Sequence, residues 1–290
     1  SMQERFIANL RKILEQGEER ALLISATGTG KTYASAFAMR ELGFKRVLFL
    51  VHRVTLAKQA KKSFEKVFDK KVTMGLVGAG SYEYEKDYVF ATVETLNRDT
   101  HLFQYQPDAF DCIILDEAHH SSNNIYTKVI DYFNPKLFLG MTATPDKRDD
   151  NQEGKNIYEI FHYQIAHEIR LQQAMEDNLL CPFHYFGISE VVSLDDKTLQ
   201  ATKLTDDEFN QLTSDERVRH VIEQSEYYGY SGDRVRGLIF CSRVKECEEL
   251  SRKFNTLGYR TIALSGSDSE EKRQKAFERL AMDEADTTEE

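Results

Sequence analysis

The sequence predicts an α/β fold in which a parallel sheet is covered by helices on both faces. Short apolar segments recur through the first half of the chain and have the length of buried strands. Amphipathic segments with helical spacing lie between several of them, as in Thr32–Leu42 and Thr55–Phe68. Strands that are apolar throughout, rather than alternating, are typical of a sheet buried on both faces. The predicted strands are Ala21–Ala26, Val47–Val51, Tyr88–Ala91, Cys112–Leu115 and Leu137–Met141.

The chain changes character after Pro145. Residues 146–155 are almost all polar or glycine and predict an exposed loop. The elements predicted beyond that loop are, in order, a helix over 157–180, a strand over Pro182–Ile188, loop with a short helix over 195–216, a strand over Gly237–Cys241, a helix over 244–256 and a strand over 260–264.

These patterns divide the chain into three predicted parts. Residues 1–145 form a first α/β domain, residues 146–230 a connector, and residues 231–290 the start of a second α/β domain. The last part holds fewer elements than a domain of about 100–150 residues requires. We therefore expect the second domain to be incomplete here and the native polypeptide to continue beyond residue 290.

Length and composition exclude several classes of protein. The 290 residues suffice for one large domain or two ordinary ones, and 41% hydrophobic with 30% charged residues is ordinary globular usage. The apolar runs are far shorter than the roughly 20 residues of a membrane-spanning helix. No secretory signal pattern opens the sequence. The cysteines lack C-x-x-C spacing, so we expect free thiols in a cytoplasmic protein; they are Cys112, Cys181, Cys241 and Cys247.

The net charge of −10 argues against a protein that simply coats a polyanion. The charge is uneven, however. Residues 1–145 hold 19 Lys and Arg against 17 Asp and Glu, a balance of +2, whereas residues 146–290 hold 19 against 31, a balance of −12. A surface for nucleic acid is therefore more plausible on the first half.

A glycine-rich segment, Ser25–Thr32, follows the first strand and opens a helix, which is the context of a phosphate-binding loop. Glycines let backbone N–H groups face a polyanion, and the helix N-terminus adds partial positive charge. Lys31 would reach the β- and γ-phosphates of ATP, and the Thr32 hydroxyl would bind Mg²⁺. The usual first glycine of this pattern is Ser25 here. The residues predicted to bind the nucleotide are Thr27, Gly28, Thr29, Gly30, Lys31 and Thr32.

A second motif follows the strand Cys112–Leu115, where two adjacent carboxylates stand at its end. Asp116 would hold Mg²⁺, and Glu117 would orient and deprotonate the attacking water. On its own, this pair could instead complement the dipole of a following helix. Together with the phosphate loop upstream it predicts ATP hydrolysis.

The segment Asp116–His119 spells Asp-Glu-Ala-His, and it resembles the DEAH box of superfamily 2 helicases and translocases. Within them, the chain is most similar to the helicase-subunit group of type III restriction enzymes. The further segments that resemble motifs Ia, Ib, III and IV, in the family's order, are Leu50–Leu56, Ala91–Leu96, Thr142–Pro145 and Leu238–Arg243. The resemblance implies two RecA-like domains, the second opening at motif IV.

The resemblance also implies roles for single residues. His119 belongs to the catalytic group, and Gln3 lies where this family reads adenine. Thr142 and Thr144 would couple the DEAH box to the nucleic-acid side. The residues implied to contact nucleic acid are Arg53, Thr55, Thr92, Ser242 and Arg243.

Each of these assignments has a structural alternative. The Thr55 hydroxyl could cap the following helix, the Thr92 hydroxyl could stabilise a turn, and a helix cap explains Ser242-Arg243 equally well. Thr142 and Thr144 could belong to a merely structural turn before Pro145.

The function that these observations favour is the N-terminal motor portion of an ATP-dependent DNA helicase or translocase. An RNA helicase and a nucleotide-gated nucleic-acid-binding module remain as alternatives, and a metabolic kinase would leave the later motifs unexplained. The family's Gln-x-x-Gly-Arg-x-x-Arg element, whose arginines neutralise the transferring phosphoryl group, does not occur in the 290 residues. We therefore expect this chain by itself to be a nearly inactive ATPase.

Overall fold

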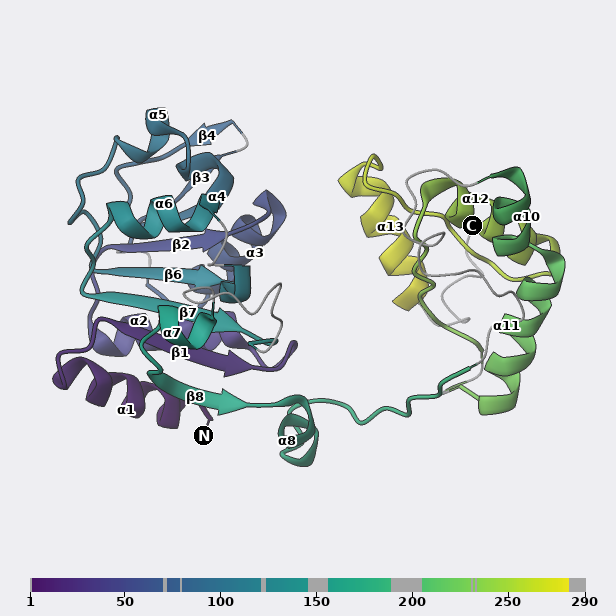
Figure 1. Cartoon of the computed structure of the whole chain (residues 1–290), viewed down its shortest axis with the longest axis horizontal. Helices are drawn as coiled ribbons and strands as arrows, with labels where there is room; N and C mark the ends of the chain where they lie inside the picture. The colour runs from purple at the N-terminus through teal and green to yellow at the C-terminus, as the bar shows by residue number, and fades with distance from the viewer. Residues whose placement is uncertain are drawn as a thin grey trace. The chain divides into compact units, whose positions relative to one another are not determined.

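The computed structural model of the chain describes residues 2–69, 72–78, 80–120, 124–145, 156–188, 205–230, 232 and 234–281 (Figure 1). The chain divides into two compact units, Ser1–Phe183 and His184–Glu290. The predicted division into functional domains at 145/146 and 230/231 stays a prediction.

The first unit is built on one sheet of eight strands within the described part of the chain, in the order β4-β3-β5-β2-β6-β7-β1-β8. Every neighbouring pair is parallel except β3 with β4, which is antiparallel. The five predicted strands are confirmed to within a residue at each end. The bounds are β1 Arg20–Ser25, β2 Val47–Val51, β3 Met74–Gly78, β4 Ser81–Tyr82, β5 Tyr88–Thr92, β6 Cys112–Asp116, β7 Leu137–Thr142 and β8 Ile165–Ile169.

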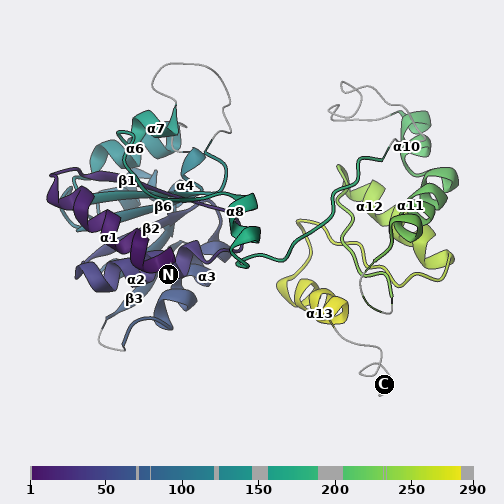
Figure 2. The same ribbon diagram turned by 90° about the horizontal axis from the view of Figure 1, so that it is seen from below.

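Helices cover both faces of this sheet, as the apolar strands predict (Figure 2). Alternate residues of β1 enter opposite cores: Leu23 packs with α1, α2 and α3, whereas Leu22 packs with α4, α6 and α7. The predicted α/β fold with a parallel sheet is thereby confirmed. The helices on the first face are α1 Met2–Glu15, α2 Lys31–Leu42 and α3 Val54–Glu65, and those contributing to the second core are α4 Val93–Leu96, α5 Asp99–Leu102, α6 Asn124–Tyr132 and α7 Ile157–Ile160.

The prediction of one helix over 157–180 is wrong. This segment forms α7, then the edge strand β8, then the short helix α8 (Leu171–Glu176). β8 pairs only with β1, and two of its five residues are buried, Ala166 and Ile169. A half-exposed edge strand retains polar residues, so its sequence does not show the continuous apolar run of a central strand.

The second unit contains, in its described residues, the helices α10 Asp206–Leu212, α11 Asp215–Tyr228, α12 Val244–Thr256 and α13 Glu270–Ala281. The predicted helix over 244–256 is confirmed. The segments of this unit predicted as strands, Gly237–Cys241 and 260–264, run as irregular chain. The predicted strand Pro182–Ile188, which spans the boundary between the two units, is irregular as well. Leu238 and Phe240 are 63% and 91% exposed, so this apolar run lacks the burial that a central strand requires.

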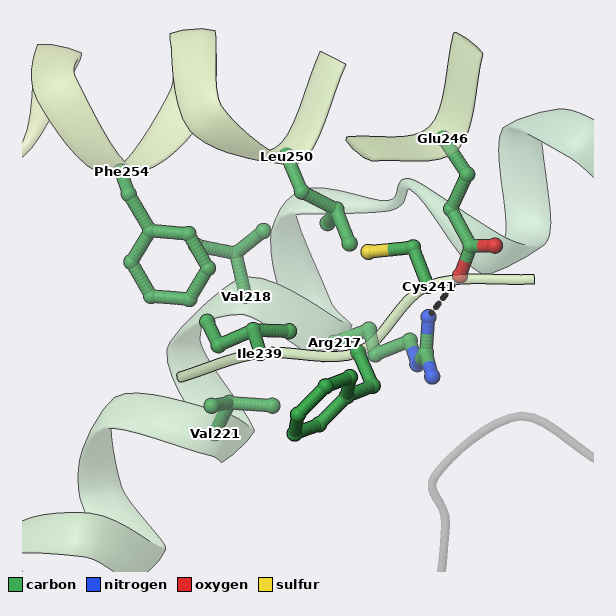
Figure 3. Close-up of a pocket in the computed structure, with 9 residues that line it drawn as sticks. Arg217, Val218, Val221, Ile239, Cys241, Glu246, Leu250 and Phe254 are labelled. Carbon is green, nitrogen blue, oxygen red and sulfur yellow. Dashed lines mark hydrogen bonds and ion pairs between the residues drawn. The ribbon is translucent and has the colours of Figure 1, made fainter. Parts of the chain in front are cut away.

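The packing of α11 against α12 forms the core of the second unit. Val218 of α11 packs with Leu250 and Phe254 of α12. With Glu246 these two residues form the buried row of α12, at helical spacing. These residues also line a pocket, together with Arg217 and Val221 of α11 and the irregular segment 239–241 (Figure 3). No helix among the described residues is both long enough and apolar enough to span a membrane.

Candidate nucleotide-binding site

The connection from β1 to α2 has the backbone of a phosphate-binding loop. Gly28 and Gly30 have φ values of 90° and 88°, which glycine adopts without strain. Gly30 stands before the first turn of α2 and supplies no side-chain cap, so the first N–H groups of that helix are not satisfied by a capping side chain. These N–H groups, together with the partial positive charge of the helix N-terminus, favour the binding of an anion there.

Ser25 replaces the usual first glycine and ties the loop together. Its buried hydroxyl lies 2.5 Å from the Thr29 hydroxyl, which in turn donates to the Ala26 carbonyl oxygen at 2.6 Å. This internal network gives the departure from the usual pattern a physical role. The Leu180 side chain also lies against the loop, since a Cβ added at Gly28 would stand 3.0 Å from its Cδ2. No sequence motif pointed to Leu180.

Lys31 interacts electrostatically with both carboxylates of the DEAH box. Its Nζ donates to the Ser25 carbonyl oxygen at 3.0 Å, at the end of β1. Burial lowers the pKa of Lys31, while the charges of Glu117 and Asp116 act in the opposite direction. The ammonium is therefore partly desolvated and sits between the loop and two acidic groups, where a phosphate could replace the carbonyl as its partner.

Asp116 ends β6, between β2 and β7. Burial, and next the charge of Glu117, raise the pKa of Asp116 to about 6, although Lys31 acts against this. A half-buried carboxylate with a raised pKa fits a cation site, because an added cation favours its ionised form. Its oxygens and the Thr32 hydroxyl are of the type that would hold Mg²⁺.

Glu117 occupies a left-handed backbone conformation with φ 52°, which non-glycine residues adopt at a cost of about 1–3 kcal/mol. Its N–H donates to Asp116 Oδ1 at 3.1 Å, and its Oε2 lies 3.3 Å from His119 Nδ1. Its side chain is 30% exposed. The two successive carboxylates at this turn are therefore both half-buried.

His119 connects the DEAH box to the end of β7. Its Nδ1 lies 3.0 Å from the Thr142 hydroxyl, and that hydroxyl accepts the N–H of Thr144 at 3.1 Å. Thr142 is fully buried, whereas Thr144 is exposed. Contacts thus run from Glu117 through His119 and Thr142 to Thr144. Coupling between the DEAH box and the segment Thr142–Pro145 would require such a continuous path.

The raised pKa of Asp116 predicts a stability effect in the ligand-free protein. The pKa of Asp116 is about 6 in the folded protein, against the ordinary 3.8 of an unfolded chain. The protonated carboxyl is tolerated in the folded form in acid, and stability is lost as the pH rises through 6, because the carboxyl must then ionise. Asp116→Asn should therefore raise the free energy of unfolding by on the order of 2 kcal/mol at pH 8 and by little at pH 4.

Urea unfolding without Mg²⁺ or nucleotide measures this difference. Asp131→Asn, on the exposed face of α6, is the control and should show no such pH dependence. An equal effect of Asp116→Asn at both pH values would contradict the prediction.

The first unit also contains residues that the sequence implicated in adenine recognition and in contacts with nucleic acid. Gln3 is half-buried in the first turn of α1, and its neighbour Met2 packs against Ala26 of the loop. Arg53 and Thr55 are exposed at the start of α3. α3 begins at Val54 with Arg53 as its cap, so the alternative that Thr55 caps this helix is wrong.

Thr92 is buried, and its hydroxyl accepts the Thr95 N–H at 3.2 Å, which caps α4. The structural alternative for Thr92 is thus observed. In the second unit, Ser242 donates to Glu246 through its N–H and its hydroxyl, at 3.2 and 3.0 Å. Arg243 caps α12 with its backbone and donates to the Ser242 hydroxyl at 2.8 Å.

Residues 1–147 match the model of the protein family described as "Type III restriction enzyme, res subunit". The chain is 26% identical over 268 residues to the type I restriction enzyme EcoAI endonuclease subunit of Escherichia coli, covering 82% of the chain and 32% of that protein. It is 28% identical over 138 residues to the DNA 3'-5' translocase XPB2 of Sulfurisphaera tokodaii, covering 47% and 29%. The chain thus spans about a third of the length of these curated relatives.

Among solved structures, the chain resembles the ATP-dependent type ISP restriction-modification enzyme LlaBIII bound to DNA. The TM-score is 0.62 at 16% identity, over 97% of this chain and 23% of that one. At this identity the likeness concerns the fold alone, and it agrees with the α/β architecture described above.

Proposed function

The chain belongs to the family of the type III restriction enzyme res subunit, and on this premise we propose that it is the motor portion of an ATP-dependent DNA helicase or translocase. The observation that carries the proposal is the meeting of Lys31, Asp116 and Glu117. These residues follow two strand ends that are separated in the sequence. After burial, the charges of the other members of the group shift the pKa of Lys31 and the pKa of Asp116. Such a cluster suits phosphoryl transfer from ATP to water.

In this proposal the loop N–H groups bind the phosphates, and the Lys31 ammonium neutralises charge on them. Thr32 and Asp116 would hold Mg²⁺, which supplies positive charge against the phosphate oxygens. Glu117 would orient the attacking water and accept its proton. The contact of His119 with Thr142 would transmit the state of this site toward the nucleic-acid side.

The proposal extends to the second unit and to nucleic acid. Arg53 and Thr55, exposed at the start of α3, are proposed to contact DNA phosphates. Thr92, Ser242 and Arg243 are engaged within the protein, so their proposed role is to position backbone N–H groups at helix starts. DNA rather than RNA as the stimulating partner would be tested by comparing how each accelerates ATP hydrolysis by the native protein.

We also propose that residues 1–290 alone turn over ATP slowly. Lys31 and Mg²⁺ neutralise only part of the charge that develops on the transferring phosphoryl group. The arginines available in the second unit stand outside any Gly-Arg-x-x-Arg sequence. Binding of nucleotide, by contrast, needs only the residues of the first unit, and it therefore provides the primary test.

Lys31→Ala should weaken binding of Mg²⁺-ADP or Mg²⁺-ATP by about 1.5–3 kcal/mol, because it removes a charged hydrogen-bond donor to phosphate. Titration calorimetry on the 290-residue chain measures this directly. Lys58→Ala, which removes an exposed lysine of α3, is the matched control and should bind as the wild type does. Equal affinities of the wild type and Lys31→Ala would overturn the assignment of the loop.

A further inference from the structure

Three aromatic side chains stand in two tiers where β4 and α5 meet, at the top of the first unit in Figure 1. The Tyr84 hydroxyl lies 2.6 Å from His101 Nδ1 and the two ring planes are 25° apart, so these rings lie side by side as a lower tier. Tyr82 of β4 stacks on His101, with ring centroids 5.0 Å apart and planes 6° apart. Tyr82 is 52% exposed. Since the lower tier covers one face of the Tyr82 ring, the opposite face is open to solvent. We call these three residues the aromatic platform.

The lower tier is anchored in the core of the first unit. Tyr84 meets the ring of Tyr105 edge to face, with centroids 5.8 Å apart, and Tyr105 is 4% exposed. The helix that carries His101, α5, is tied to α6 because Lys128 donates to Asp99 Oδ1 at 2.7 Å. The support beneath the upper ring is therefore in place before any ligand binds. A rigid support lowers the ordering cost for a ligand that stacks on it.

The aromatic platform adjoins a segment of the proposed nucleic-acid side. Gly78 of β3 pairs with Ser81 of β4, the residue before Tyr82. A Cβ added at Gly78 would stand 3.1 Å from the Thr95 hydroxyl oxygen. That hydroxyl in turn lies 2.8 Å from the Thr92 hydroxyl. Contacts thus lead from the platform to Thr92, one of the residues proposed to act toward DNA.

The surroundings of the platform favour bases over phosphates as its ligand. Glu83 and Glu85 flank Tyr84 in the sequence, and Glu85 is exposed. Carboxylates repel a phosphate, whereas stacking needs only an open ring face. Arg98, whose carbonyl oxygen accepts the His101 N–H at 2.9 Å, is 66% exposed in its side chain. It supplies a cation for the adjoining nucleic-acid backbone.

We propose that the aromatic platform binds an unpaired base of single-stranded DNA, which stacks on the open face of Tyr82. This inference rests on the proposed function, and it adds a contact to bases where that function supplies contacts to phosphates. The bases of a duplex are stacked on one another, so their faces are closed to a ring outside the double helix. The platform therefore favours single-stranded over duplex DNA, and it does so without regard to base sequence.

Tyr82→Ala removes the upper ring. We expect it to weaken binding of a fluorescein-labelled oligothymidylate of roughly 15 nucleotides by about 5–150-fold, the loss of one base stacked on an aromatic ring. Fluorescence anisotropy on the 290-residue chain measures this affinity. Tyr82→Phe keeps the ring and should bind the oligothymidylate as the wild type does.

Phe103→Ala is the matched control. Phe103 is 60% exposed at the end of α5, but its ring packs against Tyr132 with centroids 5.5 Å and planes 55° apart. Its affinity for the oligothymidylate should equal that of the wild type. A loss as large as that of Tyr82→Ala would mean that exposed apolar surface in this region, rather than the stacked ring, binds the DNA, and it would overturn the inference.

A second probe separates bases from phosphates. An abasic oligonucleotide of the same length carries the same phosphates and no bases, so Tyr82→Ala should bind it as the wild type does. Equal affinities of the wild type and Tyr82→Ala for oligothymidylate, or an equal loss with the abasic probe, would overturn the inference while the proposed function stands. If the wild type binds neither single-stranded nor duplex DNA, the DNA side of the proposed function fails as well, whereas Lys31→Ala still tests its nucleotide site.

Discussion

Replacing Glu117 by glutamine is expected to lower ATP turnover by the native protein by about 10²–10⁴-fold, the usual contribution of a positioned general base. Nucleotide binding should persist, because Glu117→Gln retains the size of the side chain and leaves Lys31 and Asp116 in place. The left-handed backbone at Glu117 is set by the turn after β6, not by its charge, so the geometry should survive the substitution. Single-turnover hydrolysis with enzyme in excess measures the loss even where the rate is low.

Glu94→Gln is the matched control for this experiment. Glu94 is also on the first unit, but its side chain is 78% exposed and its ion pair with Arg98 spans 3.8 Å, a contact of small energetic value. Its turnover should equal that of the wild type. Unchanged hydrolysis in Glu117→Gln would show that another group accepts the proton of the attacking water.

The central strands could be predicted from the sequence because burial on both faces leaves them apolar at every position. Val47–Val51 is buried throughout and shows no period that could be mistaken for a helix. β3, by contrast, contains Gly75 and Gly78, which have low strand propensity. The edge strand β8 keeps polar residues on its exposed side. β8 also pairs with β1, which is far away in the chain, and a local sequence pattern does not show such pairing.

The site could be predicted as a set of residues but not as a geometry. The phosphate loop and the carboxylate pair each form a continuous segment, so their residue types and spacing show in the sequence. The contact of His119 with Thr142 depends on β6 lying beside β7 in a particular register. That contact is not encoded in a motif.

The second unit shows the limit of inference from apolar runs. Leu238, Ile239 and Phe240 have the composition of a buried strand, yet all three are more than half exposed. A run of this kind becomes a strand only where neighbouring strands pair with its backbone. What orders this unit in the described residues is instead the contact between α11 and α12.

That contact includes a buried ion pair, and it leads to the second large effect that we expect. Glu246 of α12 is 6% exposed in its side chain, and its Oε1 lies 3.2 Å from Arg217 of α11 (Figure 3). Its Oε2 accepts both the N–H and the hydroxyl of Ser242. Glu246→Ala would leave the Arg217 guanidinium largely buried opposite an apolar methyl group and would remove both acceptors for Ser242. Removing one partner of a buried pair commonly lowers the free energy of unfolding by about 3–5 kcal/mol.

Because the two units need not unfold together, amide hydrogen exchange along α11 and α12 is the suitable measurement on the whole chain. Glu246→Ala should accelerate exchange there by at least about 10²-fold, up to the limit set by the stability of the unit, and should leave α2 and β6 unchanged. Glu248→Ala, exposed on the same helix, is the control and should alter stability by no more than about 0.5 kcal/mol. The outcome decides between two origins of order in this unit. If Glu246→Ala exchanges as slowly as Glu248→Ala, the apolar row of Leu250 and Phe254 suffices to hold α12 on α11, and the ion pair contributes little.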